Sequence, residues 1–246
     1  MIARQRLDRI VETVSRNGAA TVPELAESFG ISESTIRRDL DKLDSAGLLV
    51  KVHGGAVCLE DEHVRRELTI GERLGLHIDE KVRIARYAAS LVGPEDLVYI
   101  DAGTTCRVLA DCLAEASATY VTDSLDTALA LSARGLRAVV LGGEVKPATG
   151  AAVGPEAVDT LSRYHFTLGF WGANGVSAKQ GLTTPERLEA QVKRLSMERC
   201  ARPFVLVDHT KFGRAGAVTF ASLGAATILT DEVPPDWRDM PGIQTV

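Results

Sequence analysis

The chain has 246 residues, of which 45% are hydrophobic, and its formal net charge is −5. This composition is sufficient for a hydrophobic core and allows either one large domain or two smaller ones. It excludes bulk positive charge as a means of binding nucleic acid, and no segment approaches the ~18 consecutive apolar residues that a membrane-spanning helix needs.

The first predicted element is an amphipathic helix from Arg4 to Asn17, with apolar residues at helical spacing. No apolar signal region precedes it. The four cysteines form no CxxC pair and no cluster typical of a metal site, so we expect them to be reduced thiols. We therefore expect a cytoplasmic protein without a metal ion or cofactor.

Two further helices are predicted in the N-terminal segment. Thr21 can cap the first of them, Glu24 completes a capping box, and Gly30 is a natural end. Ser32 is expected to cap the next helix, which runs to about Ala46. Two helices joined by a tight, glycine-containing turn form a helix-turn-helix.

The stretch "LLVKVHGGAV", from Leu48 to Val57, alternates apolar and polar residues around a pair of glycines. This pattern predicts a strand, a turn and a second strand, which together would form the wing of a winged helix. A helical module for dimerisation or protein binding is the alternative, and the predicted wing makes it the weaker interpretation.

The helix after Ser32 has two distinct faces. Ile36, Leu40 and Leu43 share one of them. The opposite face carries polar side chains, namely Ser34, Arg38, Asp41, Lys42 and Ser45. Residues 1–57 contain eight basic and eight acidic residues, so any DNA binding must come from their local arrangement. A solvated helix with paired charges remains the alternative.

Three blocks of the N-terminal segment match a known family. They are Arg6, Ile10 and Val14, the motif "STIRRDL" from Ser34 to Leu40, and the motif "VHGGAV" from Val52 to Val57. In these residues and their spacing, the segment resembles the DeoR family of bacterial transcriptional regulators. The resemblance implies a winged helix-turn-helix domain, predicted at residues 1–57, whose partner is operator DNA.

The resemblance also implies a set of DNA contacts. The major groove is expected to be contacted by Ser34, Thr35, Arg38 and Lys42. A phosphate is expected to be bound by Arg37, and the backbone or minor groove by Lys51 and His53 in the wing. For Arg37 and Arg38 the alternative is a surface salt bridge to Asp41 or Glu33. Asp39 is better placed to pair with a nearby basic side chain than to contact DNA.

A linker is predicted at residues 58–75 and a second domain at residues 76–246. In this domain apolar strands alternate with helices, which indicates a mostly parallel sheet covered on both faces, a Rossmann-like α/β fold. The strands are expected in "LVYI", "TYVTDS", "RAVVLGG", "FTLGFWGANG", "PFVLVDHT" and "ATILTD". The helices include Leu125 to Ala133, Pro155 to Ser162, and Pro185 to Cys200, the last capped by Thr184.

Polar segments follow five of these strands, and they read "DAGTT", "TDS", "GGE", "GANG" and "DHTK". Because ligands on parallel sheets bind at the carboxyl ends of strands, we expect these segments to line a common crevice. The "GTT" at the start of a helix offers backbone N–H groups, hydroxyls and the helix dipole to an anion, most simply a phosphate. A plain helix cap is the alternative.

The second domain shares "EK" at Glu80 and Lys81, "DAGTT", and "LVDHTK" from Leu206 to Lys211 with the effector domain of the DeoR family, which it resembles. More remotely it resembles the ribose-5-phosphate isomerase fold. The resemblance implies a sugar-phosphate effector. Candidates for the phosphate are Lys81, Gly103, Thr104, Thr105 and Lys211, and candidates for the sugar hydroxyls are Asp101, Asp123, Ser124 and Asn174. The alternatives are a solvated Lys81 and an Asp101 that caps Thr104.

A sugar-phosphate isomerase-like enzyme is the competing function. Isomerisation needs a carboxylate base, which the isomerase pattern supplies as "DGADE" after its fourth strand. The corresponding stretch here, "WGANGVSA" from Trp171 to Ala178, contains no carboxylate, although Glu144 or Asp208 could substitute. We therefore assign no catalytic residue. The expected protein is a homodimeric or homotetrameric repressor of sugar uptake or catabolism genes, controlled by a phosphorylated sugar.

Overall fold

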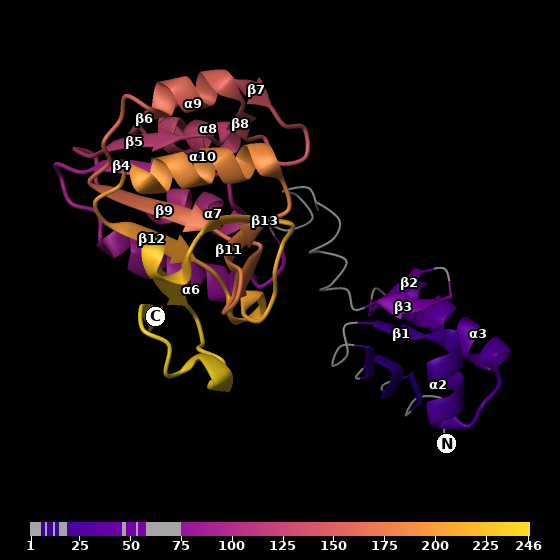
Figure 1. Ribbon diagram of the computed structural model, residues 1–246. Helices are drawn as coiled ribbons and strands as arrows, with labels where there is room; N and C mark the ends of the chain where they lie inside the picture. Colours follow the sequence, from indigo (N-terminus) through magenta and orange to yellow (C-terminus); the bar gives the residue numbers. More distant parts are fainter. Residues whose placement is uncertain are drawn as a thin grey trace. The chain divides into compact units, whose positions relative to one another are not determined.

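The computed structural model describes residues 6, 7, 9–11, 13, 14, 19–45, 48–52, 54–57 and 75–246. The chain divides into two compact units, residues 1–67 and 68–246, which we call the head and the effector domain (Figure 1). His53 and nearly all of the predicted linker lie outside the described residues. The proposed boundaries at residues 57 and 75 therefore stay predictions.

The described residues between Arg6 and Val14 are helical, and we call them the first helical segment; the described head also contains the helices α2 (Val22–Phe29) and α3 (Glu33–Ser45) and three short strands. Both helices begin and end close to the positions that the sequence predicts. Thr21 and Glu24 form the predicted capping box, and Gly30 ends α2 in the left-handed region with φ 64°. The carbonyl of Ser32 accepts the first hydrogen bonds of α3, from the N–H groups of Thr35 and Ile36.

The wing is a three-stranded antiparallel sheet in the order β1-β3-β2. The strands β2 (Val50–Val52) and β3 (Gly55–Val57) are the predicted pair, whereas β1 (Ala19–Thr21) lies where the sequence predicts only a break between helices. Gly55 explains the close approach of β1 and β3, because a Cβ at Gly55 would lie 2.4 Å from the carbonyl oxygen of Ala20. Gly54 has φ 88°, a conformation that glycine adopts readily.

A small apolar core holds the head together. The predicted inner face of α3, with Ile36, Leu40 and Leu43, is buried. It packs in one cluster with Ile10 from the first helical segment and Leu25 of α2. The side chains on the opposite face of α3 are therefore left outside the core.

The effector domain is built on a seven-stranded sheet in the order β15-β14-β12-β9-β4-β5-β6, and every neighbouring pair is parallel. The predicted strands are β4 (Leu97–Ile100), β5 (Thr119–Thr122), β6 (Arg137–Val140), β9 (Leu168–Gly172), β12 (Pro203–Leu206) and β14 (Thr227–Thr230). The C-terminal strand β15 (Ile243–Thr245) is an addition that the sequence does not predict. The expected parallel α/β fold is confirmed.

Helices cover both faces of this sheet (Figure 1). One face carries α6 (Ile78–Ser90), α7 (Thr104–Cys112) and α8 (Leu125–Ala133). The other carries α9 (Pro155–Leu161) and α10 (Arg187–Glu198). None of the helices in the described ranges is long and apolar enough to span a membrane.

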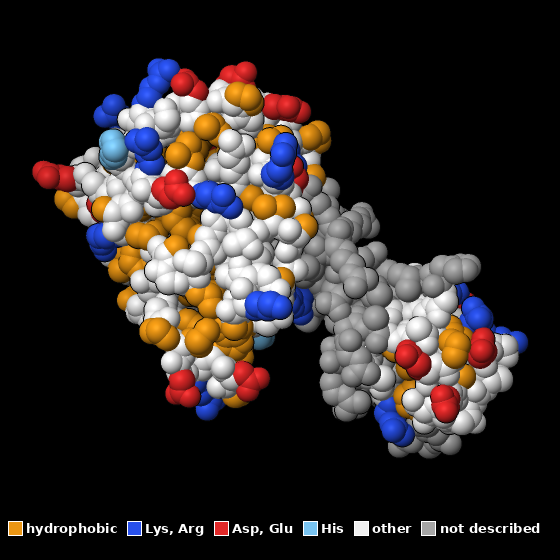
Figure 2. All heavy atoms as spheres, in the orientation of Figure 1, with side chains coloured by type: hydrophobic (Ala, Val, Ile, Leu, Met, Phe, Trp, Pro, Cys, Tyr) orange, Lys and Arg blue, Asp and Glu red, His pale blue; other side chains and the backbone are white. Residues whose placement is uncertain are grey.

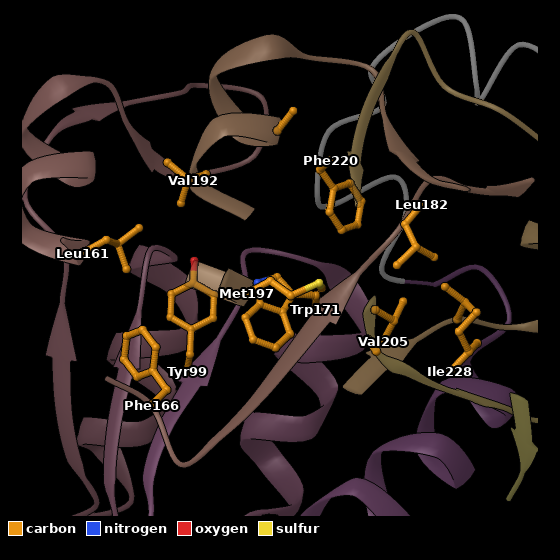
Figure 3. Close-up of a cluster of buried hydrophobic side chains, with 14 of the residues drawn as sticks. Tyr99, Leu161, Phe166, Trp171, Leu182, Val192, Met197, Val205, Phe220 and Ile228 are labelled. Carbon is orange, nitrogen blue, oxygen red and sulfur yellow. The ribbon is translucent and has the colours of Figure 1, made fainter. Parts of the chain in front are cut away.

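The core on the α9 and α10 face is rich in aromatic residues. The rings of Tyr99 and Trp171 stack with centroids 5.3 Å apart, and Phe166 lies 5.2 Å from Tyr99 (Figure 3). All three side chains are almost completely buried. The indole N–H of Trp171 donates to the hydroxyl of Ser196 on α10 at 3.0 Å, which fixes the helix against the sheet.

Smaller strands surround the carboxyl edge of the sheet. They are β7 (Glu144–Val145) with β8 (Ala152–Val153), and β10 (Gly175–Ser177) with β11 (Gly181–Thr184) and β13 (Val218–Ala221). The prediction that Thr184 caps α10 is wrong, because Thr184 ends β11. The cap is Glu186, whose carboxylate accepts the N–H of Glu189 at 3.0 Å.

Candidate functional site

The outer face of α3 carries most of the residues proposed to contact DNA. Ser34, Arg37, Arg38 and Lys42 are exposed, and Thr35 is half-buried. On the face of the head drawn in Figure 2, acidic and basic side chains are interspersed. The head thus has a helix with a polar outer face but no uniformly basic surface in that view.

The acidic residue Asp39 is turned inward. Its carboxylate accepts hydrogen bonds from Nε of Arg6 at 2.6 Å and from Nη2 of Arg6 at 3.2 Å. Asp39 is only 2% exposed, so this pair removes a negative charge from the outer face of α3. The prediction that Asp39 pairs with a basic side chain is confirmed, and the pair ties α3 to the first helical segment.

Two of the basic candidates have acidic partners. Arg37 donates to Glu33 at 3.0 Å, which is the predicted alternative for that residue, but both side chains are about half exposed. Such pairs contribute only about 0.5 kcal/mol and open easily. Lys51 on β2 contacts Asp41. Arg38 and Lys42 form no ion pair with the other described residues, so their charges are available to a partner.

In the effector domain, the order of the strands identifies the place where a ligand is expected. The chain leaves β4 towards β5 and β6, and leaves β9 towards β12, β14 and β15. The order in which the chain adds strands therefore reverses between β4 and β9, and crevices form outside the carboxyl ends of strands at such a switch point. The loop after β4 begins with Asp101 and the loop after β9 leads to Asn174, two of the predicted ligand-binding residues.

The two loops at the switch point touch each other. Oδ2 of Asp101 accepts the backbone N–H of Gly172 at 2.9 Å. A Cβ at Gly103 would lie 3.5 Å from Cα of Gly172, so glycine on both sides lets the loops approach. Asp101 does not cap α7, because the cap residue is Gly103 and no side chain caps that helix. The alternative role for Asp101 is thus wrong.

The N-terminus of α7 has the features expected of an anion site. Its first residues, Thr104 and Thr105, are 8% and 7% exposed. The N–H groups of a first helical turn have no intrahelical acceptor, and the helix dipole is positive at that end. Because no side chain caps α7, these N–H groups remain available to a ligand such as a phosphate.

Lys193 of α10 is a second buried lysine of the effector domain, 6% exposed, and it was not predicted from the sequence. Its ammonium group contacts Oδ2 of Asp101 and donates to the carbonyl oxygen of Gly172 at 3.2 Å. Burial alone would lower the pKa of Lys193, but the carboxylates of Asp101 and Glu189 outweigh it and raise the pKa. Lys193 therefore stays charged. Its position in an amphipathic helix resembles that of any surface lysine, so the sequence carries no signal for this role.

Asp123, at the end of β5, is also buried, at 2% exposed. Burial, followed by the charge of Asp101, raises its pKa well above the usual value for an aspartate, which favours the protonated form. Its Oδ1 atom has no hydrogen-bond partner among the described residues. A buried carboxyl group of this kind can exchange hydrogen bonds with a sugar hydroxyl.

A second buried carboxylate, Glu189, joins α10 to the β7–β8 hairpin. It accepts hydrogen bonds from the hydroxyl of Thr149 at 2.8 Å and from Nζ of Lys146 at 3.1 Å. Burial would raise the pKa of Glu189, but the charges of Lys193 and Lys146 lower it. Glu189 is therefore ionised. Glu189, Thr149 and Lys146 were not predicted from the sequence.

Two other sugar candidates already have partners within the chain. The hydroxyl of Ser124 caps α8 by accepting the N–H of Thr127 at 3.2 Å. The side-chain oxygen of Asn174 lies 3.3 Å from the hydroxyl of Thr184, which donates to it. A ligand that binds either residue must share or replace these contacts.

The two lysines proposed for the phosphate lie in different surroundings. Lys81, in the first turn of α6, is only 4% exposed, so the alternative of a solvated residue is wrong. Lys211 is partly exposed, and its Nζ lies 3.7 Å from the buried Asp208. Burial would raise the pKa of Asp208, but Lys211 and the hydrogen bonds from Thr210 lower it. Asp208 is thus an ionised carboxylate stabilised by Lys211 and Thr210, and its lowered pKa makes it a poor base.

The described residues contain no group of three or more histidines, cysteines or acidic side chains that could hold a metal ion. The acidic side chains near the switch point have other roles than metal binding. Asp101 and Glu189 bind lysines, and the pKa of Asp123 favours its neutral form. The chemistry of the site is therefore that of recognition through charge and hydrogen bonds.

Family models match both parts of the chain. A DeoR-like helix-turn-helix domain matches residues 6–62, and a DeoR C terminal sensor domain matches residues 76–232. The chain is 35% identical over 233 residues, 94% of this chain and 92% of the other, to the uncharacterized HTH-type transcriptional regulator FruR of Bacillus subtilis. It is 31% identical over 249 residues to the lactose phosphotransferase system repressor of Staphylococcus aureus, covering 100% of this chain and 97% of the other.

Among solved structures, ribose 5 phosphate isomerase A from Neisseria gonorrhoeae matches 54% of this chain and 52% of its own, with 14% identity and a TM-score of 0.40. The two family models together cover the head and the effector domain described above. The chain therefore belongs to the DeoR family of transcriptional regulators, with a helix-turn-helix domain followed by a sensor domain.

Proposed function

We propose that this regulator is a cytoplasmic repressor of genes for sugar uptake or catabolism, and that a phosphorylated sugar controls it from the switch point of the effector sheet. The observation that carries the proposal is the uncapped N-terminus of α7 beside the buried cluster of Asp101, Asp123 and Lys193. The helix N-terminus can bind a phosphate, and the polar cluster can form hydrogen bonds with hydroxyl groups.

The relatives support a regulator rather than a sugar-phosphate isomerase. Those matched over nearly the whole chain are named as transcriptional regulators, and one is named a repressor of a lactose phosphotransferase system. The buried charges of the site favour the same conclusion, because a base that abstracts a carbon-bound proton must be free to accept it. The carboxylates of Asp101 and Glu189 are instead bound by lysines.

In the head, the proposed recognition helix is α3. Arg38 and Lys42 would enter the major groove with Ser34 and Thr35, while Arg37 would leave Glu33 for a phosphate. Lys51, and His53 beyond the described residues, would contact the DNA from the wing. A homodimer or homotetramer would present two such helices to paired half-sites.

The proposed control is a shift between two populations. A phosphosugar that binds one arrangement of the effector domains more tightly than the other changes operator affinity by the ratio of the two affinities. The phosphate would be held by Gly103, Thr104 and Thr105 with Lys81 and Lys211. The sugar would be held by Asp123, with Asp101, Ser124 and Asn174 around it.

The test has two stages. A panel of pentose and hexose phosphates is first screened for an increase in the melting temperature of the full-length protein, with the unphosphorylated sugars as matched controls. Any compound that stabilises the protein is then added to a titration of operator DNA selected from a random pool. A phosphosugar that raises the melting temperature and weakens operator binding supports the proposal. A panel that changes neither quantity contradicts it.

A further inference from the structure

Three buried carboxyl groups lie at the carboxyl edge of the effector sheet, and two of them bind a lysine. Asp101 binds Lys193, and Glu189 binds Lys146 at 3.1 Å. Asp123 is nearly as buried as Asp101, at 2% against 1% exposed, but it forms no ion pair with another described residue. The three acids therefore share two cations, and Asp123 is the acid that is left unpaired among the described residues.

Asp123 and Asp101 lie side by side on one face of the sheet. Tyr99 of β4 pairs in register with Val121 of β5, and both belong to the core that packs under α9 and α10. Each aspartate follows two residues later, just past the end of its strand, and side chains two residues apart on a strand point to the same face. The charges that act on Asp123 are those of Asp101 and of two residues on α10, which agrees with this placement.

Lys193 is bonded to Asp101 rather than to Asp123. An ammonium group has three donors. That of Lys193 contacts Oδ2 of Asp101, donates to the carbonyl oxygen of Gly172 at 3.2 Å, and lies over the ring of Phe220, 5.6 Å from its centroid. No hydrogen bond joins it to Asp123 among the described residues. One ammonium group thus lies near two carboxyl groups and is bonded to one of them.

The other titratable groups near Asp123 carry no charge. Burial, followed by the charges of the neighbouring aspartates, raises the pKa of Tyr99 on β4 and that of Cys106 on α7 well above their usual values. Burial and the charge of Asp101 likewise raise the pKa of Asp123, which favours its protonated form. A carboxylate at this place would be buried without a partner, which costs far more free energy than burying the neutral acid.

A protonated carboxyl group recognises other groups than a carboxylate does. A carboxylate only accepts hydrogen bonds, whereas the neutral acid also donates one through its O–H. Oδ1 of Asp123 is buried and has no hydrogen-bond partner among the described residues. Since nearly all buried polar groups have a partner, this atom points to a group that enters the crevice at the switch point.

We infer that Asp123 binds the effector as a neutral carboxylic acid and donates a hydrogen bond to a hydroxyl or carbonyl oxygen of the phosphosugar. The inference rests on the proposed function and adds to it the chemistry of one contact. A ligand with an ammonium group at this place would have to displace the proton of Asp123. The contact therefore favours phosphates of neutral sugars over phosphates of amino sugars.

An asparagine at position 123 separates the two forms, because its amide has the shape of the carboxyl group and, like the neutral acid, both donates and accepts hydrogen bonds. The variants are Asp123→Asn and Asp123→Ala, and the matched control is Asp239→Asn, at an exposed aspartate of the same domain. The probes are the pentose and hexose phosphates of the thermal screen, together with hexosamine phosphates. Isothermal titration calorimetry measures the dissociation constant of each compound that binds the full-length protein.

We expect Asp123→Asn to bind the phosphosugar within about threefold of the unmodified protein, and Asp123→Ala to raise the dissociation constant at least about tenfold, as for a lost buried hydrogen bond. Equal losses in the two variants would overturn the inference, because they would show that a carboxylate is required. Equal affinities in all four proteins would exclude the contact itself. A panel in which no compound binds would instead contradict the proposed function, and the contact would fall with it.

The protonation of Asp123 also has a readout that needs no ligand. Because its folded pKa lies above the unfolded value of about 3.9, the folded protein keeps a proton that the unfolded chain releases, and stability falls as the pH rises from about 4 towards the folded pKa. Asp123→Asn removes this loss, so its unfolding constant should fall relative to that of the unmodified protein by up to about tenfold per pH unit. Denaturant unfolding followed by tryptophan fluorescence of the effector domain measures the difference. The same pH dependence in both proteins would rule out the neutral acid.

Discussion

Lys193 on α10 and Asp101 after β4 form a buried ion pair that also binds the carbonyl oxygen of Gly172, so one ammonium group joins the two strands of the switch point. The two side chains come from positions 92 residues apart in the chain. The pair thus makes α10 a structural part of the proposed effector site. Removing the ion pair should lower the stability of the domain as well as its affinity for the effector.

Replacing Lys193 with methionine should destabilise the effector domain by about 3–5 kcal/mol, because it leaves the carboxylate of Asp101 buried without its partner. Both tryptophans of the chain, Trp171 and Trp237, lie in the effector domain, so denaturant unfolding followed by tryptophan fluorescence reports on that domain. The control is Arg163→Ala, which breaks an exposed pair with Asp159 and should cost no more than about 0.5 kcal/mol. Equal effects of the two variants would contradict the buried pair.

Replacing Arg38 with alanine should weaken specific operator binding and leave the fold unchanged, because its exposed side chain forms no ion pair with the described residues. The loss of one good base contact corresponds to about 1–3 kcal/mol, or roughly 10- to 100-fold in affinity. Fluorescence anisotropy with selected operator DNA measures it. Arg163→Ala in the effector domain serves as the control, and an unchanged affinity for Arg38→Ala would remove the recognition role.

Replacing Gly55 with alanine should disrupt the wing, since the new Cβ would lie 2.4 Å from the carbonyl oxygen of Ala20. We expect a destabilisation of about 1–3 kcal/mol in the head and weaker DNA binding. Tryptophan fluorescence of the effector domain should not change. The control is Gly224→Ala, because a Cβ at Gly224 would meet nothing within 4 Å. Operator binding that survives Gly55→Ala intact would show that the wing is not needed.

Replacing Lys211 with alanine should weaken the binding of any phosphosugar found in the screen, while operator binding without effector stays the same. Lys211 is partly exposed, and only its 3.7 Å pair with Asp208 is lost within the described residues. Isothermal titration calorimetry with the phosphosugar should show a higher dissociation constant. Lys179→Ala, another exposed lysine, is the matched control. Equal affinities for both variants would exclude Lys211 from the phosphate site.

The pH dependence of stability should contain a contribution from His209. Burial alone would lower its pKa, but the hydrogen bond and charge of Asp231 raise it, with Nδ1 and Oδ2 2.7 Å apart. Because the folded pKa lies above the unfolded value of about 6.5, this stabilisation is complete at lower pH and is lost as the pH rises through the folded pKa. His209→Gln should remove that trend from denaturation curves measured between acidic and alkaline pH. If the stability of His209→Gln declined with pH in the same way as that of the unmodified protein, the pH dependence would come from other groups.

The sequence predicts the elements whose signals are local. The capping box of Thr21 and Glu24, the glycine end at Gly30 and the apolar faces of the helices depend on neighbouring residues, and they are confirmed. The strand β1 escapes prediction because two alanines and a threonine carry no alternating pattern. The assignment of Thr184 as a cap fails because Thr184 still belongs to β11 and α10 begins only at Arg187, where the carboxylate of Glu186 caps it.

The candidate site is predictable only in part, for a physical reason. Residues directly after strands, such as Asp101 and Asp123, can be placed at the carboxyl edge because parallel strands end together. Lys193, Glu189 and Lys146 reach the same edge through the packing of α10 and a hairpin, which no sequence period encodes. The sequence shows which loops meet, but not which helix side chains lie between them.

Glu189 and Lys193 are four residues apart on α10, a rise of about 6 Å along the helix. The helix therefore fixes the distance between the carboxylate of Glu189 and the ammonium group of Lys193 along its axis. Because Lys193 binds Asp101 and Glu189 binds Lys146, this separation also relates the loop after β4 to the β7–β8 hairpin. A variant with the two charges exchanged would place a lysine beside Lys146 and a carboxylate beside Asp101, so both ion pairs would be lost.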